Sequence, residues 1–195
     1  KEEINTLPAF ERLGLAHIHV VSTALQAQAA LAALQSCAVL GFDTESKPTF
    51  VKDQVSQGPH VLQLATLSQA FVFQLHDADC RAAAVGILQS PSITKVGFGL
   101  AGDHTQILRT LGVRPAQVLD LNHVFRERGY IKELGVRGAV AVMFGQRFVK
   151  SKKASTSNWA QPRLSESQIL YAANDAWGAI KVYAALGLGP DHPID

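Results

Sequence analysis

The apolar stretch Cys37-Ala-Val-Leu-Gly-Phe42 is followed directly by Asp43-Thr-Glu45, which carries two acids. A short run of almost only apolar residues is typical of a β-strand that is buried on both faces. Side chains two residues apart on a strand point to the same face, so Asp43 and Glu45 are expected to share one space at the strand end. Taken alone, an Asp-x-Glu pair at such a place is most often a solvated loop mouth.

Three further polar residues strengthen the pattern. Residues 165–183 open with a Ser-x-x-Gln capping box and continue with good helix formers, and within them Tyr171 and Asp175 lie one helical turn apart on one face. Asp103 follows a glycine-rich turn. Alone, Asp103 would be a helix N-cap and Tyr171 a core residue with its hydroxyl at the rim. Together, buried carboxylates are costly unless a cation compensates, and all-oxygen ligands suit Mg²⁺ or Mn²⁺.

Length and composition predict one compact domain over residues 1–195, because the chain is 47% hydrophobic and no segment looks disordered. No apolar stretch reaches the roughly 18 residues of a membrane span, so no membrane association is expected. Cys37 and Cys80 lack metal-ligand spacing, which favours a reducing compartment. We expect a cytoplasmic protein, nuclear or organellar in a eukaryote. The chain starts at Lys1 without a signal peptide or an initiator Met, so we expect a trimmed chain whose native form extends further.

The net charge of +2 is weak evidence for nucleic acid, but its distribution says more. Residues 147–163 contain no acid and are expected to form a basic loop interrupted by Trp159. A solvated surface loop is the plain alternative. If the loop binds nucleic acid, four basic side chains would neutralise backbone phosphates: Lys150, Lys152, Lys153 and Arg163.

Hydrophobic patterns and turn residues predict an α/β fold with a mixed sheet flanked by helices. Strands are expected at residues 18–21, 37–42, 60–66, 70–75, 93–96 and 117–121. Helices are expected at residues 23–35, 79–89, 103–111, 124–128 and 132–144 and from residue 165 onward. Residues 67–69 would close a hairpin, so the sheet would begin as an antiparallel meander and continue with parallel strands.

A competing motif is Gly97-Phe-Gly-Leu-Ala-Gly102, which satisfies Gly-x-Gly-x-x-Gly and has Asp120 at a suitable distance for a dinucleotide ribose. That fingerprint normally opens a repeat of parallel strands, whereas here a meander precedes it. A nicotinamide site would also leave Asp43 and Asp175 without a purpose. We therefore interpret Gly97, Gly99 and Gly102 as a tight turn that delivers Asp103 at the start of a helix.

The residues resemble the three exonuclease motifs of the DEDD superfamily, tyrosine subclass, which includes ribonuclease D and the proofreading domain of family A DNA polymerases. The resemblance rests on Gly41-Phe-Asp-Thr-Glu45, Val96-Gly-Phe-Gly-Leu-Ala-Gly-Asp103 and Leu164-Ser-Glu-Ser-Gln-Ile-Leu-Tyr-Ala-Ala-Asn-Asp-Ala176. Ser157-Asn-Trp159 resembles the Werner-syndrome exonuclease branch. The resemblance covers about residues 18–186 and implies a ribonuclease H-like fold.

It also implies the chemistry: a metal-dependent 3′-5′ exonuclease that hydrolyses phosphodiester bonds with two Mg²⁺ or Mn²⁺ ions and releases nucleoside 5′-monophosphates. Asp43 would bridge the ions, Glu45 and Asp175 would complete the site of the ion that activates water, and Asp103 would support the second ion. Tyr171 with Glu45 would orient the attacking water. Tyr171 is not expected to be the base, because its ordinary pKa near 10 keeps it neutral.

The substrate is expected to be a single-stranded or 3′-tailed end of DNA or RNA, and Ser157-Asn-Trp159 tilts the expectation towards DNA. Gln63 and Leu64 match positions that in relatives face the terminal nucleotide, although plain sheet packing explains them equally well. Thr44 is also expected to contact nucleic acid. Relatives often carry an aromatic residue after the first Glu, where this chain has Ser46, so base stacking would have to come from elsewhere. Trp159 is a candidate, and a buried anchor for the loop is an equal alternative. A catalytically silent binding module on the same fold is the alternative, and the sequence does not indicate the oligomeric state.

Overall fold

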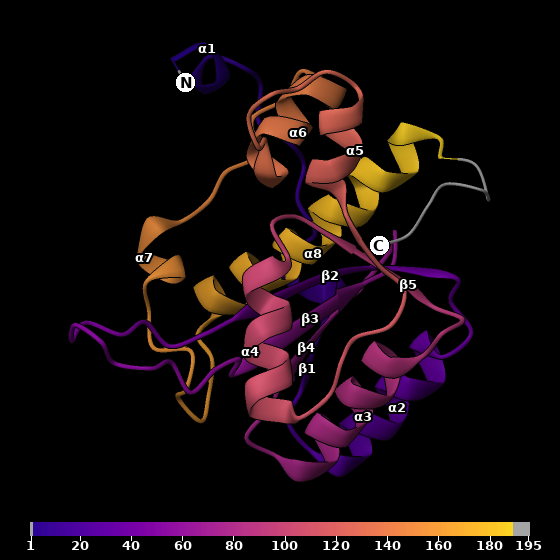
Figure 1. The fold of residues 1–195 in the computed structure, drawn as a ribbon, viewed down its shortest axis with the longest axis vertical. Helices are drawn as coiled ribbons and strands as arrows, with labels where there is room; N and C mark the ends of the chain where they lie inside the picture. Colours follow the sequence, from indigo (N-terminus) through magenta and orange to yellow (C-terminus); the bar gives the residue numbers. More distant parts are fainter. Residues whose placement is uncertain (1, 189–195) are drawn as a thin grey trace.

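The computed structural model describes residues 2–188 and shows a six-stranded mixed sheet with helices on both faces (Figure 1). The strand order is β1-β4-β3-β2-β5-β6. The strands are β1 (Ile18–Val21), β2 (Val39–Glu45), β3 (Val61–Ala65), β4 (Ala70–Gln74), β5 (Thr94–Gly97) and β6 (Val118–Asp120). The helices are α1 (Glu2–Asn5), the 3-10 turn η1 (Leu15–His17), α2 (Ala24–Leu34), α3 (Ala78–Gln89), α4 (Ala101–Leu111), α5 (Leu121–Glu127), α6 (Gly135–Phe144), α7 (Lys152–Ser155) and α8 (Glu166–Leu186).

Pairing in the sheet changes direction at β2, as the sequence predicted. Strands β2, β3 and β4 form an antiparallel meander, and β5 and β6 then add to β2 in parallel. In the meander Phe42 lies opposite Leu64, and Asp43 lies opposite Gln63. Strand β1 closes the other edge in parallel with β4. The ribonuclease H-like mixed sheet is therefore confirmed, with β2 in the middle of the ladder.

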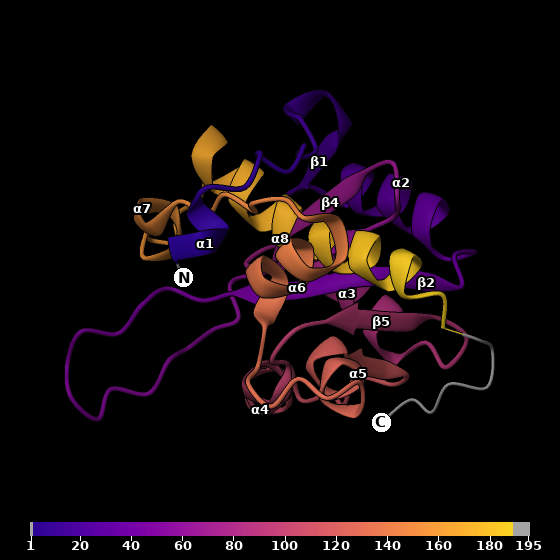
Figure 2. The ribbon, with the colours of Figure 1, turned by 90° about the horizontal axis from the view of Figure 1, so that it is seen from above.

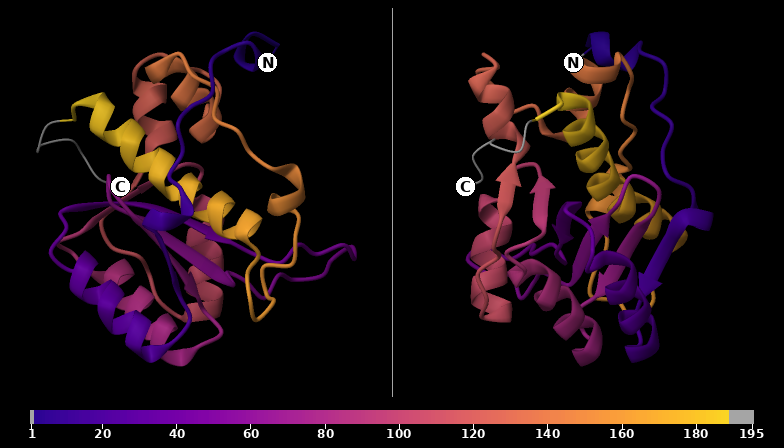
Figure 3. Two further views of the ribbon diagram at one scale, coloured as in Figure 1. Left: turned by 180° about the vertical axis from the view of Figure 1, so that it is seen from behind. Right: turned by 90° about the vertical axis from the view of Figure 1, so that its right-hand side faces the viewer.

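Each face of the sheet carries its own apolar core. One core gathers α2, α3 and the buried Ile107 of α4, and the other gathers α5, α6 and α8. Figures 2 and 3 show these two groups of helices on opposite sides of the sheet. The near-continuous apolar strands that the sequence shows are explained by this double coverage, because β3 and β4 are buried at every position.

Helix α8 lies unusually close to β2. A Cβ added to Gly41 would stand 2.0 Å from the carbonyl oxygen of Ala176, so only glycine allows this approach. The helix meets the sheet with small side chains, among them Ala172, Ala173 and Ala176, which are fully buried. The capping box predicted for the start of α8 is present between Ser165 and Gln168. The apolar run before Asp43 and the alanine-rich helix thus fit each other at short range.

Some element boundaries differ from the sequence prediction. Strand β2 extends to Glu45, so both acids belong to the strand and do not follow it. Helix α4 begins at Ala101, which makes Asp103 its third residue and neither its first residue nor its N-cap. The basic segment was predicted to be a loop throughout, which is wrong because it contains the short helix α7. Ser151 caps the start of this helix, and its side chain accepts a hydrogen bond from the Ala154 N–H at 3.1 Å. Within residues 2–188 there is no helix of the length and apolar character that crossing a membrane requires.

Gly41→Ala should lower the free energy of unfolding by about 1 to 3 kcal/mol, because the new methyl group would push α8 off the strand. Urea unfolding without metal measures this. Gly86→Ala is the matched control, since Gly86 is an exposed helical glycine with open space around its Cβ position. Alanine there should leave stability unchanged or raise it by up to about 1 kcal/mol. Equal stability of the two variants would mean that the contact at Gly41 relaxes freely.

Candidate metal centre

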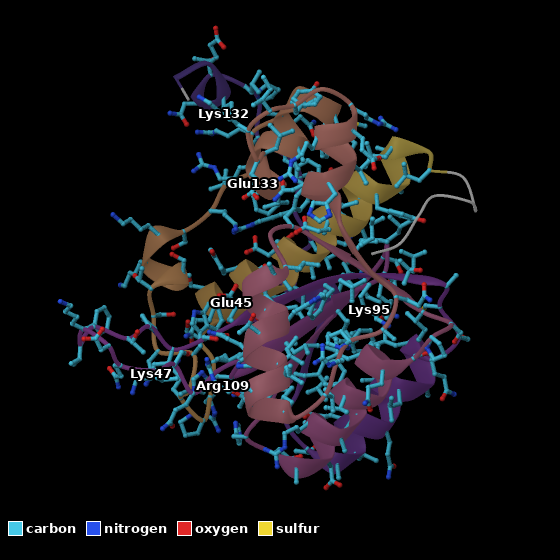
Figure 4. All side chains as sticks on the ribbon, viewed as in Figure 1. Glu45, Lys47, Lys95, Arg109, Lys132 and Glu133 are labelled. Carbon is cyan, nitrogen blue, oxygen red and sulfur yellow. The ribbon has the colours of Figure 1, made fainter. Side chains whose placement is uncertain are left out.

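Three carboxylates from two distant parts of the chain meet at the end of β2. One oxygen of each of Asp43, Glu45 and Asp175 lies within 4.8 Å of the others. Asp43 and Glu45 share a face of β2, and Asp175 lies on α8 next to Ala176, the residue that contacts Gly41. The close approach of helix and strand therefore brings the three acids together. Figure 4 labels Glu45 where α4, α8 and β2 converge.

Asp103 lies beside this group. Among the described residues, it is not one of the acids whose carboxylate oxygens all lie within 4.8 Å of one another. The Thr44 hydroxyl donates a short hydrogen bond to Oδ1 of Asp103, and the Thr44 N–H donates to Oδ1 of Asp43 at 2.9 Å. Thr44 was expected to contact nucleic acid, which stays a prediction. Its hydroxyl ties the acid of α4 to strand β2, so Thr44 orients two of the four carboxylates.

Burial and mutual repulsion hold these acids partly in their protonated forms when no cation is present. Burial raises the pKa of Asp43 well above its ordinary value, and the nearby Asp175 and Glu45 raise it further. Burial, followed by the charge of Asp175, raises the pKa of Glu45 to about 8. The pKa values of Asp103 and Asp175 are also raised, chiefly by burial. Such raised values are typical of a site that is completed by a cation.

Tyr171 is clamped between two side chains at the edge of the group. Its ring centroid is 5.9 Å from that of Trp159, and the Lys150 Nζ lies 5.3 Å from it on a cation–π contact. Burial and then the charge of Asp175 raise the pKa of Tyr171 to about 12. The phenol is therefore neutral at physiological pH, and it is suited to orient a water molecule by hydrogen bonding.

Lys150 enters the centre itself, which the sequence did not predict. Its Nζ forms an ion pair with Oδ2 of Asp175 at 2.9 Å. Lys150 was expected to contact backbone phosphates, as were Lys152, Lys153 and Arg163. Those three residues are exposed, whereas Lys150 is half-buried. Lys150 differs from them because its side chain pairs with Asp175 of α8, a contact with a distant part of the chain that composition alone does not reveal.

Gln63 and Leu64 separate to opposite faces of β3. Gln63 lies opposite Asp43, and its Nε2 donates a long 3.5 Å hydrogen bond to Oε1 of Glu45. Leu64 is fully buried in the core under α2 and α3, so the expected contact of its side chain with a nucleotide is wrong. Neighbouring residues on a strand point to opposite faces, so only one of this pair could face the acids.

Trp159 is also unavailable for stacking on a base. Its side chain is 1% exposed, and its indole N–H donates to the Ser155 carbonyl at 3.3 Å. Gln168 at the start of α8 donates to Ser157 Oγ and to the Asn158 carbonyl. The Ser-Asn-Trp segment therefore joins the basic segment to the start of α8.

The glycine motif does not form a dinucleotide site. Both carboxylate oxygens of Asp120, which would have bound a ribose, accept the backbone N–H groups of Gly99 at 3.1 Å and Leu100 at 2.9 Å. Those N–H groups would otherwise face a pyrophosphate. Gly97 allows the end of β5 to lie close to β2, since a Cβ there would stand 2.5 Å from the Phe42 carbonyl oxygen. The glycines serve to start α4 beside β2.

An arm at residues 46–60 projects from the sheet between β2 and β3 (Figure 2). Its base is fixed to α4, because Arg109 donates to the Ser56 carbonyl at 2.7 Å and Thr110 to the Gly58 carbonyl at 2.6 Å. Figure 4 labels Lys47 and Arg109 at this base. At its tip Phe50 is 85% exposed. Phe50 is the first aromatic residue after Glu45, and no sequence motif singled it out.

The donor set fits divalent metal ions. It consists of carboxylate oxygens, which Mg²⁺ and Mn²⁺ prefer, and it gathers more negative charge than hydrogen bonds in the described residues compensate. Oδ1 of Asp175 is buried and has no hydrogen-bond partner among those residues. A buried carboxylate oxygen is costly to leave unpaired, so this atom indicates a ligand position.

Metal-free protein should lose stability as the pH rises from about 4.5 to about 8. The carboxyl of Glu45 has a folded pKa of about 8 against an ordinary 4.5, so its contribution is complete below the ordinary value and is lost as the pH rises through the folded one. Thermal unfolding in a chelator measures this. Glu45→Gln, which removes the titration, should flatten the pH dependence, and so should added Mg²⁺. A stability that rises with pH would contradict the assigned electrostatics.

Comparison with known proteins agrees with this geometry. A family model described as 3′-5′ exonuclease matches residues 18–188. The mouse bifunctional 3′-5′ exonuclease/ATP-dependent helicase WRN is 29% identical over 151 residues, which is 76% of this chain and 11% of that protein. The human exonuclease mut-7 homolog is 34% identical over 186 residues, which is 80% of this chain and 20% of that protein. The chain spans between about a tenth and about half of such curated relatives.

Solved structures share the fold. The Nibbler EXO domain of Aedes aegypti superposes with a TM-score of 0.76 at 24% identity and covers 90% of this chain and 89% of that one. Ribonuclease D of Trypanosoma brucei, in complex with RNA U12, gives a TM-score of 0.77 at 20% identity and covers 100% of this chain and 67% of that one. Since the family model matches nearly the whole chain, this protein belongs to the 3′-5′ exonuclease family.

Proposed function

We propose that this protein is a metal-dependent 3′-5′ exonuclease that removes nucleoside 5′-monophosphates from the 3′ end of single-stranded or 3′-tailed DNA or RNA. The observation that carries the proposal is the convergence of Asp43, Glu45 and Asp175 within 4.8 Å in a chain of this family. An inactive copy of the fold would have no need to retain three buried acids at such electrostatic cost. We further propose that residues 1–195 act as one domain in an intracellular setting.

The proposed chemistry assigns separate roles to the chain's own residues. Asp43, Glu45 and Asp175 would hold two ions, Mg²⁺ or Mn²⁺, with Asp103 supporting from α4. When bound, such ions lower the pKa of water and stabilise charge on the leaving oxygen. Tyr171, neutral and clamped, would orient the attacking water together with Glu45.

Strand binding is proposed to use the exposed basic residues on α7 and its neighbourhood, namely Lys152, Lys153 and Arg163. Phe50 on the arm offers an exposed ring for stacking, a role that the buried Trp159 cannot fill. Gln63, beside Glu45 on the sheet, is the remaining candidate for contact with the terminal nucleotide. The choice between DNA and RNA is left to a contact with the 2′-OH of the substrate.

Purified protein with Mg²⁺ or Mn²⁺ should shorten matched 3′-tailed DNA or RNA stepwise from the 3′ end, and Asp43→Ala should abolish this. Denaturing gels resolve the ladder, and chromatography identifies the released monophosphates. Binding without any metal-dependent shortening would instead favour the silent module. Mid-strand fragments would indicate an endonuclease.

Tyr171→Phe should reduce turnover by roughly 10²-fold while leaving Mn²⁺ affinity and strand affinity nearly unchanged, because only the hydroxyl that orients the water is lost. Single-turnover kinetics and Mn²⁺ titration measure the two quantities. Tyr183→Phe is the control, since Tyr183 lies on the same helix and packs against the core away from the acids. Wild-type turnover in Tyr171→Phe would remove the proposed role.

Strand affinity measured in Ca²⁺, over a range of salt concentrations, should separate charge from stacking. Replacing both Lys152 and Lys153 by Ala should reduce the slope of log affinity against log salt by about 1.4, since each phosphate contact on a single strand contributes about 0.7. Phe50→Ala should weaken binding by about tenfold and leave the slope unchanged. If neither variant differed from wild type, the substrate would follow another path.

A further inference from the structure

Lys150 is built into the catalytic centre. Its Nζ lies 2.9 Å from Oδ2 of Asp175, and the side chains are 28% and 4% exposed. The same ammonium faces the ring of Tyr171, with 5.3 Å between Nζ and the ring centroid. An ion pair at such low exposure is screened much less than a surface pair. Lys150 thus contacts both α8 residues that the proposed reaction needs.

The backbone that carries Lys150 is fixed from both sides. The Arg147 N–H donates to the Pro8 carbonyl at 2.8 Å, and the Phe10 N–H donates to the Arg147 carbonyl at 2.9 Å. Phe148 is buried and would contact a Cβ placed on Gly178 of α8. Lys150 therefore reaches Asp175 from a backbone segment that is fixed by hydrogen bonds and packing.

The ion pair with Lys150 makes the two carboxylate oxygens of Asp175 different from each other. Oδ2 accepts the ammonium, while Oδ1 is buried and has no hydrogen-bond partner in the described chain. A carboxylate held by one oxygen presents the other in a defined direction. Without Lys150 the contact that fixes Oδ2 of Asp175 would be lost, and a buried charge would lose its compensating partner.

The ammonium group also places a positive charge beside the proposed metal site. Asp43, Glu45 and Asp175 together supply three negative charges when ionised, and Lys150 neutralises one of them. A positive charge a few ångströms from a metal position opposes metal binding by Coulomb repulsion. Positioning and repulsion act in opposite directions on metal affinity, but only the positioning supports turnover.

We propose that Lys150 is a positioning residue and a built-in counter-cation: it holds Asp175 and Tyr171 in place in the metal-free protein and weakens divalent metal binding in return. This inference rests on the proposed metal-dependent function of the same site. It assigns Lys150 a role distinct from that of the exposed Lys152 and Lys153, which would contact phosphates.

The test compares wild type with Lys150→Met, Lys150→Gln and Lys150→Arg at one neutral pH. Affinity for Mn²⁺ alone is measured by electron paramagnetic resonance of the free ion, and melting temperatures are measured in chelator and in saturating Mn²⁺. Lys150→Met should bind Mn²⁺ about tenfold more tightly or better, because the repulsion is gone. Its metal-free melting temperature should fall by about 5 to 10 °C, and Mn²⁺ should restore most of the loss.

Turnover of Lys150→Met should nevertheless fall by at least about tenfold, because Tyr171 and Asp175 lose their alignment. Lys150→Arg should keep the Mn²⁺ affinity of wild type, since it keeps the charge, and Lys150→Gln provides a second neutral variant if the methionine variant folds poorly. Lys132→Met is the matched control. Lys132 is exposed and lies far from Glu45 in Figure 4, so its loss should change neither Mn²⁺ affinity nor melting temperature.

Two results would overturn the inference. If Lys150→Met and Lys150→Gln bind Mn²⁺ no more tightly than wild type, the ammonium does not compete with metal. If Mn²⁺ affinity is unchanged and only strand affinity and its salt slope fall, Lys150 is a phosphate contact, as its sequence context first suggested. Absence of Mn²⁺ binding in the wild type would instead contradict the proposed function itself, so the two failures are distinguishable.

Discussion

The close contact between α8 and β2 is the constraint on which the rest of the structure depends. It exists because Gly41 has no side chain at the point where the Ala176 carbonyl approaches the strand. Asp43 follows Gly41 by two residues on the strand, and Asp175 precedes Ala176 on the helix. A helix held one methyl group further away would carry Asp175 and Tyr171 away from the acids of β2. Packing at backbone distance therefore sets the geometry of the metal centre.

The second theme is the management of negative charge. Burial raises the pKa values of Asp43 and Glu45, so the metal-free centre retains protons or needs a cation. Lys150 supplies one positive charge from within the chain, and it does so beside Asp175. Thr44 and Gln63 add hydrogen bonds to the flanking acids. These contacts therefore hold the site in shape before any metal ion binds, although the pKa values of its buried carboxyls are raised.

The surroundings of the centre divide into parts that hold it and parts that are open to a strand. Trp159 packs against Tyr171, and Gln168 donates to the Asn158 carbonyl, so the basic segment is joined to α8. Within this segment Lys150 pairs with Asp175, while Lys152 and Lys153 are exposed. The arm between β2 and β3 is fixed at its base to α4 and exposes its tip. The basic segment thus supplies Lys150 to the centre, while its exposed lysines and the exposed Phe50 of the arm remain available to substrate.

The sequence by itself determined the order of the elements, the change from antiparallel to parallel pairing, and the acids that gather. These properties depend on local periodicity, turn residues and short motifs, which are written within a few residues of one another. The tertiary structure alone decided which side chains of the loops turn inward. Lys150 and Lys152 look alike in sequence, yet Lys150 pairs with Asp175 in the centre and Lys152 is exposed. Their difference comes from a contact with a residue of α8, far along the chain, and no local pattern encodes such a contact.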